Sequence, residues 1–168
     1  NIMVPVEDPL TWKHRMGFLR DIVFPSGTLR LFSVKIAEES MNSVIRSLSN
    51  RLFRKGPEVK IDSEEHSTKE RQLIELGEPL KAEDLLVTSS LIECRHFLEG
   101  ISITAQVMRS MYFAPNIMFL SMSNDRSKDE RLEDMIAVAV REKMGIAVYS
   151  QHPKNALGDQ KTLNVWLR

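Results

Sequence analysis

Two adjacent carboxylates, Glu7 and Asp8, come nearest to a ligand site among the side chains of this 168-residue chain. They follow the apolar stretch 2–6, so they stand where a strand would end, and together they could bind a cation or a ribose. However, adjacent side chains of a strand point to opposite faces. Asp8 directly before Pro9 is also typical of an Asx-type turn. A solvated turn is therefore the simpler interpretation of this pair.

The other reactive side chains do not form a recognisable centre. His14, His66, His96 and His152 lie in separate stretches, and none pairs with another His or Cys at zinc spacing. In Cys94-Arg95-His96 the thiol and the imidazole are too close in sequence to act together without a third group. We therefore expect Cys94 to be a buried structural residue. Ser89-Ser90 lacks the Gly-x-Ser-x-Gly elbow of the hydrolases. The sequence predicts no catalytic residues and no metal site.

The glycines and the charges limit the possible ligands. The seven glycines are scattered, and the stretch 123–127 contains none, whereas a phosphate-binding loop needs close approach of the backbone. Lysine and arginine number 23, and so do aspartate and glutamate, so no overall field would attract nucleic acid. The single cysteine fits a reducing compartment. No apolar run approaches the ~20 residues that span a bilayer. We predict no cofactor and no nucleic-acid partner.

Periodicity predicts alternating strands and helices. Alternating or continuous apolar runs predict strands at 2–6, 29–36, 85–90, 115–122, 146–149 and 163–168. Helical spacing predicts helices from about Thr11 (as N-cap) to 23, over 38–53, over 96–111 and from 127 to Gly145. Gly100, inside one of these helices, would mark a tight approach to the sheet. The charged segment 58–84 has little to bury and is predicted to be a long mobile loop, with a short strand or helix near Gln72–Leu76 as the alternative.

These elements predict an α/β fold: a three-layer, doubly wound, mainly parallel sheet with helices on both faces. We expect a single domain over 1–168. Because both ends of the sequence fall inside strand-like runs, we expect it to be an excerpt of a longer chain. A ligand crevice of such a sheet lies at the carboxyl ends of the strands. The residues expected there are Glu7, Asp8, Lys35, Ser89, Ser90, Ser123, Asn124 and Asp125.

The first eight residues, Asn1-Ile2-Met3-Val4-Pro5-Val6-Glu7-Asp8, resemble the first strand of universal-stress-type domains. Nucleotide-binding members of that family present an acid at the position of Asp8. Members that bind ATP carry a glycine-rich loop after the fourth strand, where this sequence has Ser123-Asn124-Asp125-Arg126-Ser127-Lys128. The resemblance implies one alternative function, a universal-stress-like nucleotide-binding domain with Asp8 and Asn124 as ligand-binding residues.

A second resemblance covers residues 86–168. The succession of Val87-Thr88-Ser89-Ser90, the helix with Gly100, Ala114-Pro115-Asn116-Ile117-Met118-Phe119-Leu120, Gly145-Ile146-Ala147-Val148 and Leu163-Asn164-Val165-Trp166 is similar to the cytosolic C-terminal domain of cation–chloride cotransporters. Those domains are themselves similar in fold to universal stress proteins. The resemblance implies a non-enzymatic regulatory and dimerisation domain on the cytoplasmic face of the membrane. Its partners would be a second copy and the membrane transport domain of the same chain, which moves chloride with sodium or potassium.

Overall fold

A five-stranded parallel sheet forms the centre of the protein. The computed structural model describes residues 1–36, 61–122 and 129–150. The strands lie in the order β3-β2-β1-β4-β5, so β1 is central. Residue Ile2 of β1 stands opposite both Leu29 of β2 and Ile117 of β4. The strands are β1 (Ile2–Pro5), β2 (Thr28–Ile36), β3 (Leu86–Cys94), β4 (Ile117–Met122) and β5 (Gly145–Ser150).

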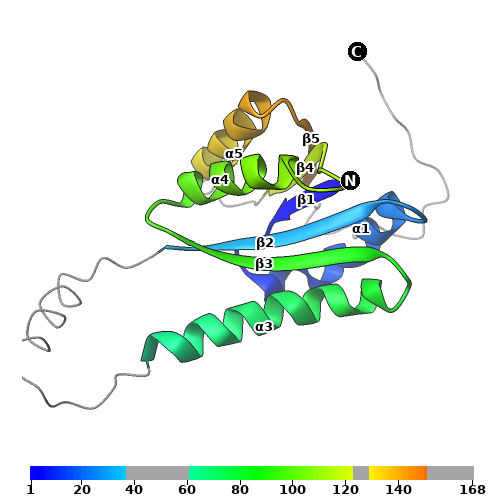
Figure 1. Cartoon of the computed structure of the whole chain (residues 1–168), viewed down its shortest axis with the longest axis horizontal. Coiled ribbons are helices and arrows are strands. Elements are labelled where there is room, and N and C mark those ends of the chain that lie inside the picture. Colours follow the sequence, from blue (N-terminus) through cyan, green and yellow to red (C-terminus); the bar gives the residue numbers. More distant parts are fainter. Residues whose placement is uncertain (37–60, 123–128, 151–168) are drawn as a thin grey trace, which may run out of the picture.

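Helices cover both faces of this sheet, as Figure 1 shows. One face carries the 3-10 helix η1 (Pro9–Arg15), α1 (Met16–Val23) and α3 (Ile61–Lys81). The opposite face carries α4 (Phe97–Arg109) and α5 (Asp129–Arg141). The sequence therefore predicted the fold class correctly: an α/β protein with a three-layer, doubly wound parallel sheet.

Two apolar cores separate the three layers. The alternation of side chains along each strand sends one set to each face. On one face Trp12, Leu19 and Leu76 of the helices pack against Val4, Leu31 and Phe119. On the other face the helices contribute Ile101, Ala105, Met108, Met135 and Ala139, which pack against Met3, Phe32, Met118 and Leu120.

Asp8, and not Thr11, caps the first helical segment. The Asp8 carboxylate accepts a hydrogen bond of 3.0 Å from the backbone N–H of Leu10, and Pro9 fills the first helical position. Thr11 is already inside the turn, and its hydroxyl donates to the Asp8 carbonyl at 2.8 Å. The prediction of a Thr11 cap was wrong because Asp8-Pro9 starts the helix three residues earlier. The Asx-type turn predicted at Asp8 is confirmed.

The prediction of a long mobile loop over 58–84 was also wrong, because residues 61–81 form α3. Leu73, Leu76 and Leu80, spaced three and four residues apart, are buried against the sheet. Gly77 lies on the same side, where an added Cβ would come within 3.0 Å of Val87 Cγ1. A narrow apolar stripe is therefore enough to dock a helix that is otherwise polar. Residues 82–84 form a turn, and residues 58–60 lie outside the described ranges.

Other element boundaries differ from the expectation in detail. β3 extends to Cys94, beyond the predicted end at 90. α4 ends at Arg109, before the predicted end at 111, and Tyr112 after it is exposed. Gly100 does mark a tight approach, since an added Cβ would lie 2.7 Å from Val34 Cγ1. The predicted helix 38–53 and the predicted strand 163–168 lie outside the described residues.

Candidate functional site

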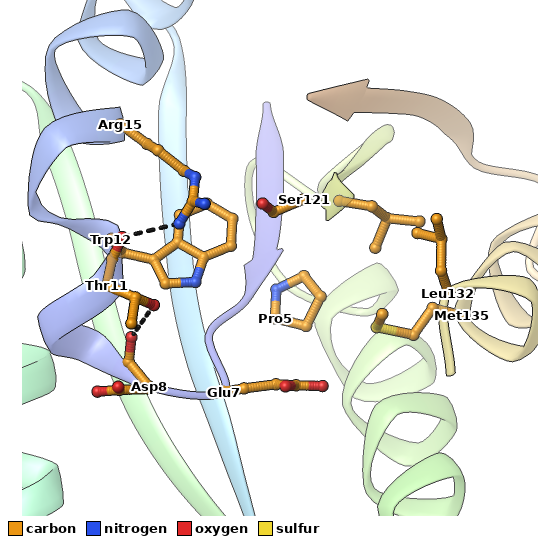
Figure 2. A pocket seen from close by; sticks show the side chains of 10 residues that line it. Pro5, Glu7, Asp8, Thr11, Trp12, Arg15, Ser121, Leu132 and Met135 are labelled. Atoms are coloured by element: carbon orange, nitrogen blue, oxygen red, sulfur yellow. Dashed lines mark hydrogen bonds between the residues drawn. The ribbon is translucent and has the colours of Figure 1, made fainter. Parts of the chain in front are cut away.

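A cleft lies at the carboxyl ends of β1 and β4. The order of the strands reverses between these two neighbours, which is the usual position of a ligand crevice in open α/β sheets. The cleft has a volume of about 260 Å³. Figure 2 shows the side chains that line it. They are Pro5 at the end of β1 and Glu7 and Asp8 after that strand, Thr11, Trp12 and Arg15 of η1, Leu120 and Ser121 of β4, and Leu132 and Met135 of α5.

The two adjacent carboxylates of this cleft point away from each other, as Figure 2 shows. The Asp8 carboxylate faces the start of η1, where it accepts the bond from Leu10 N–H. The Glu7 carboxylate lies 3.6 Å from the guanidinium of Arg131 on α5. Each carboxylate thus has a structural contact of its own, and the pair does not converge on one ligand.

Arg15 is the cation of the cleft. Its guanidinium stacks over the rings of Trp12 and Tyr149, at 5.1 and 5.8 Å from their centroids. Its Nη1 donates to the Thr11 carbonyl at 2.8 Å, while its buried Nε has no protein partner. Burial lowers the pKa of Arg15 from its ordinary value, and the neighbouring Tyr149 partly offsets this shift. Arg15 is the one basic side chain among the residues described as lining the cleft, so an anionic group is the ligand that this wall favours.

Sequence reasoning missed the Trp12–Arg15 pair. The only local signal is their spacing of three residues, which places both side chains on one side of a helical turn. Trp12 is 4% exposed and packs edge-on against Phe119 with 6.2 Å between ring centroids, so it belongs to the core. Tyr149, the second ring over Arg15, comes from β5, and no sequence pattern links it to η1.

Of the predicted rim residues, the structure places Glu7 and Asp8 in this cleft. Ser89 and Ser90 lie in the middle of β3, since that strand runs on to Cys94, and the Ser89 hydroxyl donates to the Leu73 carbonyl of α3 at 3.2 Å. Lys35 lies on β2 and does not line the cleft. Ser123, Asn124 and Asp125 lie outside the described residues. Of Asp8 and Asn124, the ligand-binding residues of the nucleotide-binding alternative, the structure describes only Asp8.

Cys94 lies at the end of β3, partly buried and packed against the core beneath α4. Desolvation is the main cause that raises the pKa of its thiol, and the Glu99 carboxylate adds to the effect. The thiol is therefore protonated at neutral pH, which suits a structural cysteine better than a nucleophile. His14 and His96 are exposed in separate elements. Within the described ranges, no group of three or more His, Cys, Asp or Glu side chains could hold a metal ion.

In the part of the chain that the structure describes, no helix combines the length and the apolar character needed to cross a bilayer.

Comparison with known proteins gave a family and a related structure. A family model described as the prokaryotic cation-chloride cotransporter C-terminal domain, first part, matches residues 58–157. The chain is also similar to the crystal structure of the cytoplasmic domain of a prokaryotic cation chloride cotransporter, with 25% identity and a TM-score of 0.66. That similarity covers 94% of this chain and 48% of the other. This chain therefore spans about half of that cytoplasmic domain.

The chain also shows a weaker structural similarity to a universal stress protein. The crystal structure of a universal stress protein in complex with cAMP aligns with a TM-score of 0.48 and 10% identity, over 89% of this chain and 94% of that protein. A search of curated proteins found no match.

Proposed function

Because this chain belongs to the family of prokaryotic cation-chloride cotransporter C-terminal domains, we propose that it is a cytoplasmic regulatory and dimerisation domain of such a cotransporter. In this proposal the chain follows the membrane transport domain, forms a homodimer and does no chemistry of its own. The transported ions would be chloride together with sodium or potassium.

One observation carries the proposal: the family model matches residues 58–157, which is more than half of the chain. The fold agrees with it, since the related cytoplasmic domain aligns along nearly all of this chain. The cleft is consistent with a non-enzymatic role, because both of its carboxylates have structural contacts and its arginine is held by two rings.

The outer surface of the α4–α5 layer supports dimerisation. Ile103 and Val107 of α4 are exposed by 43% and 50%, and Val140 of α5 is exposed by 63%. The side chains of these two helices that are buried against the sheet are others, among them Ile101, Met108 and Met135. A protein partner can cover apolar side chains that are exposed on the separate domain. A second copy placed over this layer would remove the three side chains from water.

Sedimentation equilibrium of the purified domain, with and without millimolar ATP, tests the proposal. We expect a dimer whose dissociation constant is the same in both conditions. A domain that is monomeric at all accessible concentrations would contradict the dimerisation function.

The same experiment separates the proposal from the nucleotide-binding alternative. If ATP changed the association state, calorimetric titration with ATP would follow on the parent domain and on Asp8→Ala, with Glu130→Ala as the matched exposed control. A binding signal that disappears only in Asp8→Ala would favour the universal-stress-like function and contradict the proposed one.

A further inference from the structure

Arg15 brings an unpaired positive charge to the wall of the cleft. Within the described residues its one hydrogen bond runs from Nη1 to the Thr11 carbonyl, at 2.8 Å, and it forms no ion pair with a described carboxylate. Most of the N–H donors of the guanidinium, the buried Nε among them, therefore have no protein partner. Burial lowers the pKa of Arg15, so an added anion would stabilise its charged form.

The two aromatic rings beside Arg15 orient the guanidinium without using up its donors. Its central carbon lies 5.1 Å from the centroid of the Trp12 ring and 5.8 Å from that of the Tyr149 ring. Attraction between a cation and a ring face does not need an N–H···O hydrogen bond. The N–H groups thus remain able to donate to oxygen atoms of a ligand. An arginine that is already held in place also loses less conformational entropy when it binds.

A hydroxyl group stands beside this cation. Ser121 of β4 pairs in register with Tyr149 of β5, so the two side chains stand at one level on the same face of the sheet. Ser121 is half-buried and lines the cleft, and its hydroxyl makes no hydrogen bond within the described residues. Figure 2 shows this hydroxyl pointing toward the side of the cleft on which Arg15 lies. The cleft therefore offers a guanidinium and a hydroxyl as neighbouring donors.

The carboxylates of the cleft do not take the place of an anion at Arg15. Figure 2 shows Arg15 and Ser121 at one end of the cleft and Glu7 and Asp8 at the other. The Glu7 carboxylate lies 3.6 Å from the guanidinium of Arg131, which offsets its charge. The Asp8 carboxylate caps η1. The end of the cleft at Arg15 thus keeps a positive charge.

The size of the cleft and the geometry of a guanidinium select the ligand. The volume of about 260 Å³ lies below the range of roughly 300–1,000 Å³ of pockets that enclose drug-sized molecules. A small ligand therefore fits better than a nucleotide. The planar fork of N–H groups in arginine matches the paired oxygens of carboxylates and phosphates, which accept two parallel hydrogen bonds.

We propose that this cleft binds a small oxyanion, either free phosphate or a small carboxylate, whose oxygens accept hydrogen bonds from the Arg15 guanidinium and the Ser121 hydroxyl. The site differs from that of the nucleotide-binding alternative, which rests on Asp8 and Asn124. It also goes beyond the proposed function, because it gives the domain a ligand and does not depend on dimerisation.

Nuclear magnetic resonance of the isotope-labelled domain tests this site. The probes are sodium phosphate, sodium acetate and sodium chloride, compared at equal ionic strength. We expect phosphate or acetate to shift the Trp12 indole N–H and the backbone N–H groups of Arg15 and Ser121 until saturation, with a dissociation constant of about 1 mM or below. The tighter of the two identifies the source of the oxyanion. The chain has two tryptophans, so Trp166→Phe assigns the indole signal.

Substitutions at the two donors should weaken binding to different degrees. Arg15→Gln should raise the dissociation constant at least about 100-fold, and Arg15→Lys, which keeps the charge but not the fork, about tenfold. Ser121→Ala removes only the hydroxyl and should also raise it about tenfold. Lys13→Gln, which removes an exposed charge from the same helix η1, is the matched control and should leave binding unchanged. If Arg15→Gln does not fold, Arg15→Lys and Ser121→Ala decide the test.

Several results would overturn the oxyanion site. Saturation by chloride at the same concentrations would contradict the choice of an oxyanion, and undiminished binding in Ser121→Ala and Arg15→Lys would exclude these donors. A titration with ATP that gives binding about 100-fold tighter than phosphate, lost in Asp8→Ala, would favour the nucleotide-binding alternative. The dimer is measured separately by sedimentation, so failure of the oxyanion site leaves the proposed function untouched.

Discussion

Gly100 controls how closely α4 approaches the sheet. An added Cβ would lie 2.7 and 2.9 Å from the two γ-methyl groups of Val34, a β-branched side chain that has few alternative rotamers. We expect Gly100→Ala to lower the free energy of unfolding by about 1–3 kcal/mol through overpacking, less the small gain in helix propensity. Chemical denaturation of the domain measures the change.

Gly17 provides the matched control for that substitution. It also lies in a helix, α1, but a Cβ added there would meet no atom within 4 Å. Gly17→Ala should therefore stabilise the domain by about 0.5–1 kcal/mol. If both substitutions stabilise, the close contact between α4 and Val34 is not a constraint. If the double variant Gly100→Ala with Val34→Ala regains the stability lost in Gly100→Ala, the close contact with Val34 is confirmed as the constraint.

Glu142 links the C-terminal ends of α4 and α5. Its carboxylate accepts bonds from Gln106 and Arg141, at 3.2 and 3.3 Å, and lies 3.4 Å from Arg109. The hydrogen bond from Gln106 is the largest of the causes that lower the pKa of Glu142 below its ordinary value of 4.5, followed among the lowering causes by Arg141 and then Arg109. The charged form is therefore bound more favourably in the folded state than in the unfolded state.

The pH dependence follows from the direction of that shift. The contribution of Glu142 is complete above its ordinary pKa and is lost as the pH falls through the lowered pKa of the folded state. Glu142→Gln should lower the melting temperature at pH 7, and the difference from the parent should shrink as the pH is taken below 4.5. Thermal unfolding followed by circular dichroism across this range measures it. Glu133→Gln, at an exposed position of α5, is the control. If Glu142→Gln lowered the melting temperature equally at every pH, the effect would not come from the charge.

At the scale of elements, α3 shows how little apolar surface a docked helix requires. Leu76 is 4% exposed and faces the sheet, whereas Ile74, on the same helix, is 41% exposed. Leu76→Ala should destabilise the domain by about 2–5 kcal/mol because it leaves a cavity beneath the helix. Ile74→Ala should change the stability by less than about 0.5 kcal/mol. Urea denaturation of both variants measures this; equal effects would contradict the observed orientation of α3.

The elements that sequence reasoning recovered are those whose pattern is local. β1, β2 and β4 are continuous or alternating apolar runs. Such a run can be recognised as a strand from its own residues, without knowledge of its neighbours. α3 was missed because its first half is polar, and because Gly77 and Pro79 interrupt the part that carries the apolar stripe. The apolar stripe is buried against β3, β2 and the η1–α1 segment, and a local pattern does not contain these neighbours.

The candidate site could be predicted only in part for the same reason. Asp8 was found because it follows a strand and precedes a proline, both of which are local signals. The stack of Arg15 between Trp12 and Tyr149 joins residues more than 130 positions apart, and it exists only because β5 lies beside β4. Sequence reasoning therefore placed Glu7 and Asp8 at the end of β1, where they line the cleft, but did not find Arg15.

At the scale of the whole molecule, the proposed dimer can be tested through one side chain. Val107 is 50% exposed on the outward face of α4, so Val107→Glu should not disturb the core. A charge buried between two copies should raise the dissociation constant of the dimer at least about tenfold, which corresponds to ~1.4 kcal/mol. Ile22→Glu, at a 45% exposed position on α1 in the other helical layer, is the matched control. Equal dissociation constants for Val107→Glu and the parent would exclude this face.

The central position of β1 has a mechanical consequence. The strand that contains the first residues is bonded to β2 on one side and to β4 on the other, and the Asn1 carbonyl holds the loop before β4. A pull on the polypeptide at Asn1 acts along the axis of β1, so it loads both ladders of hydrogen bonds in shear at the same time. The end of the chain does not peel away under such a load. The load is instead shared by β2 and β4, the two strands that flank β1.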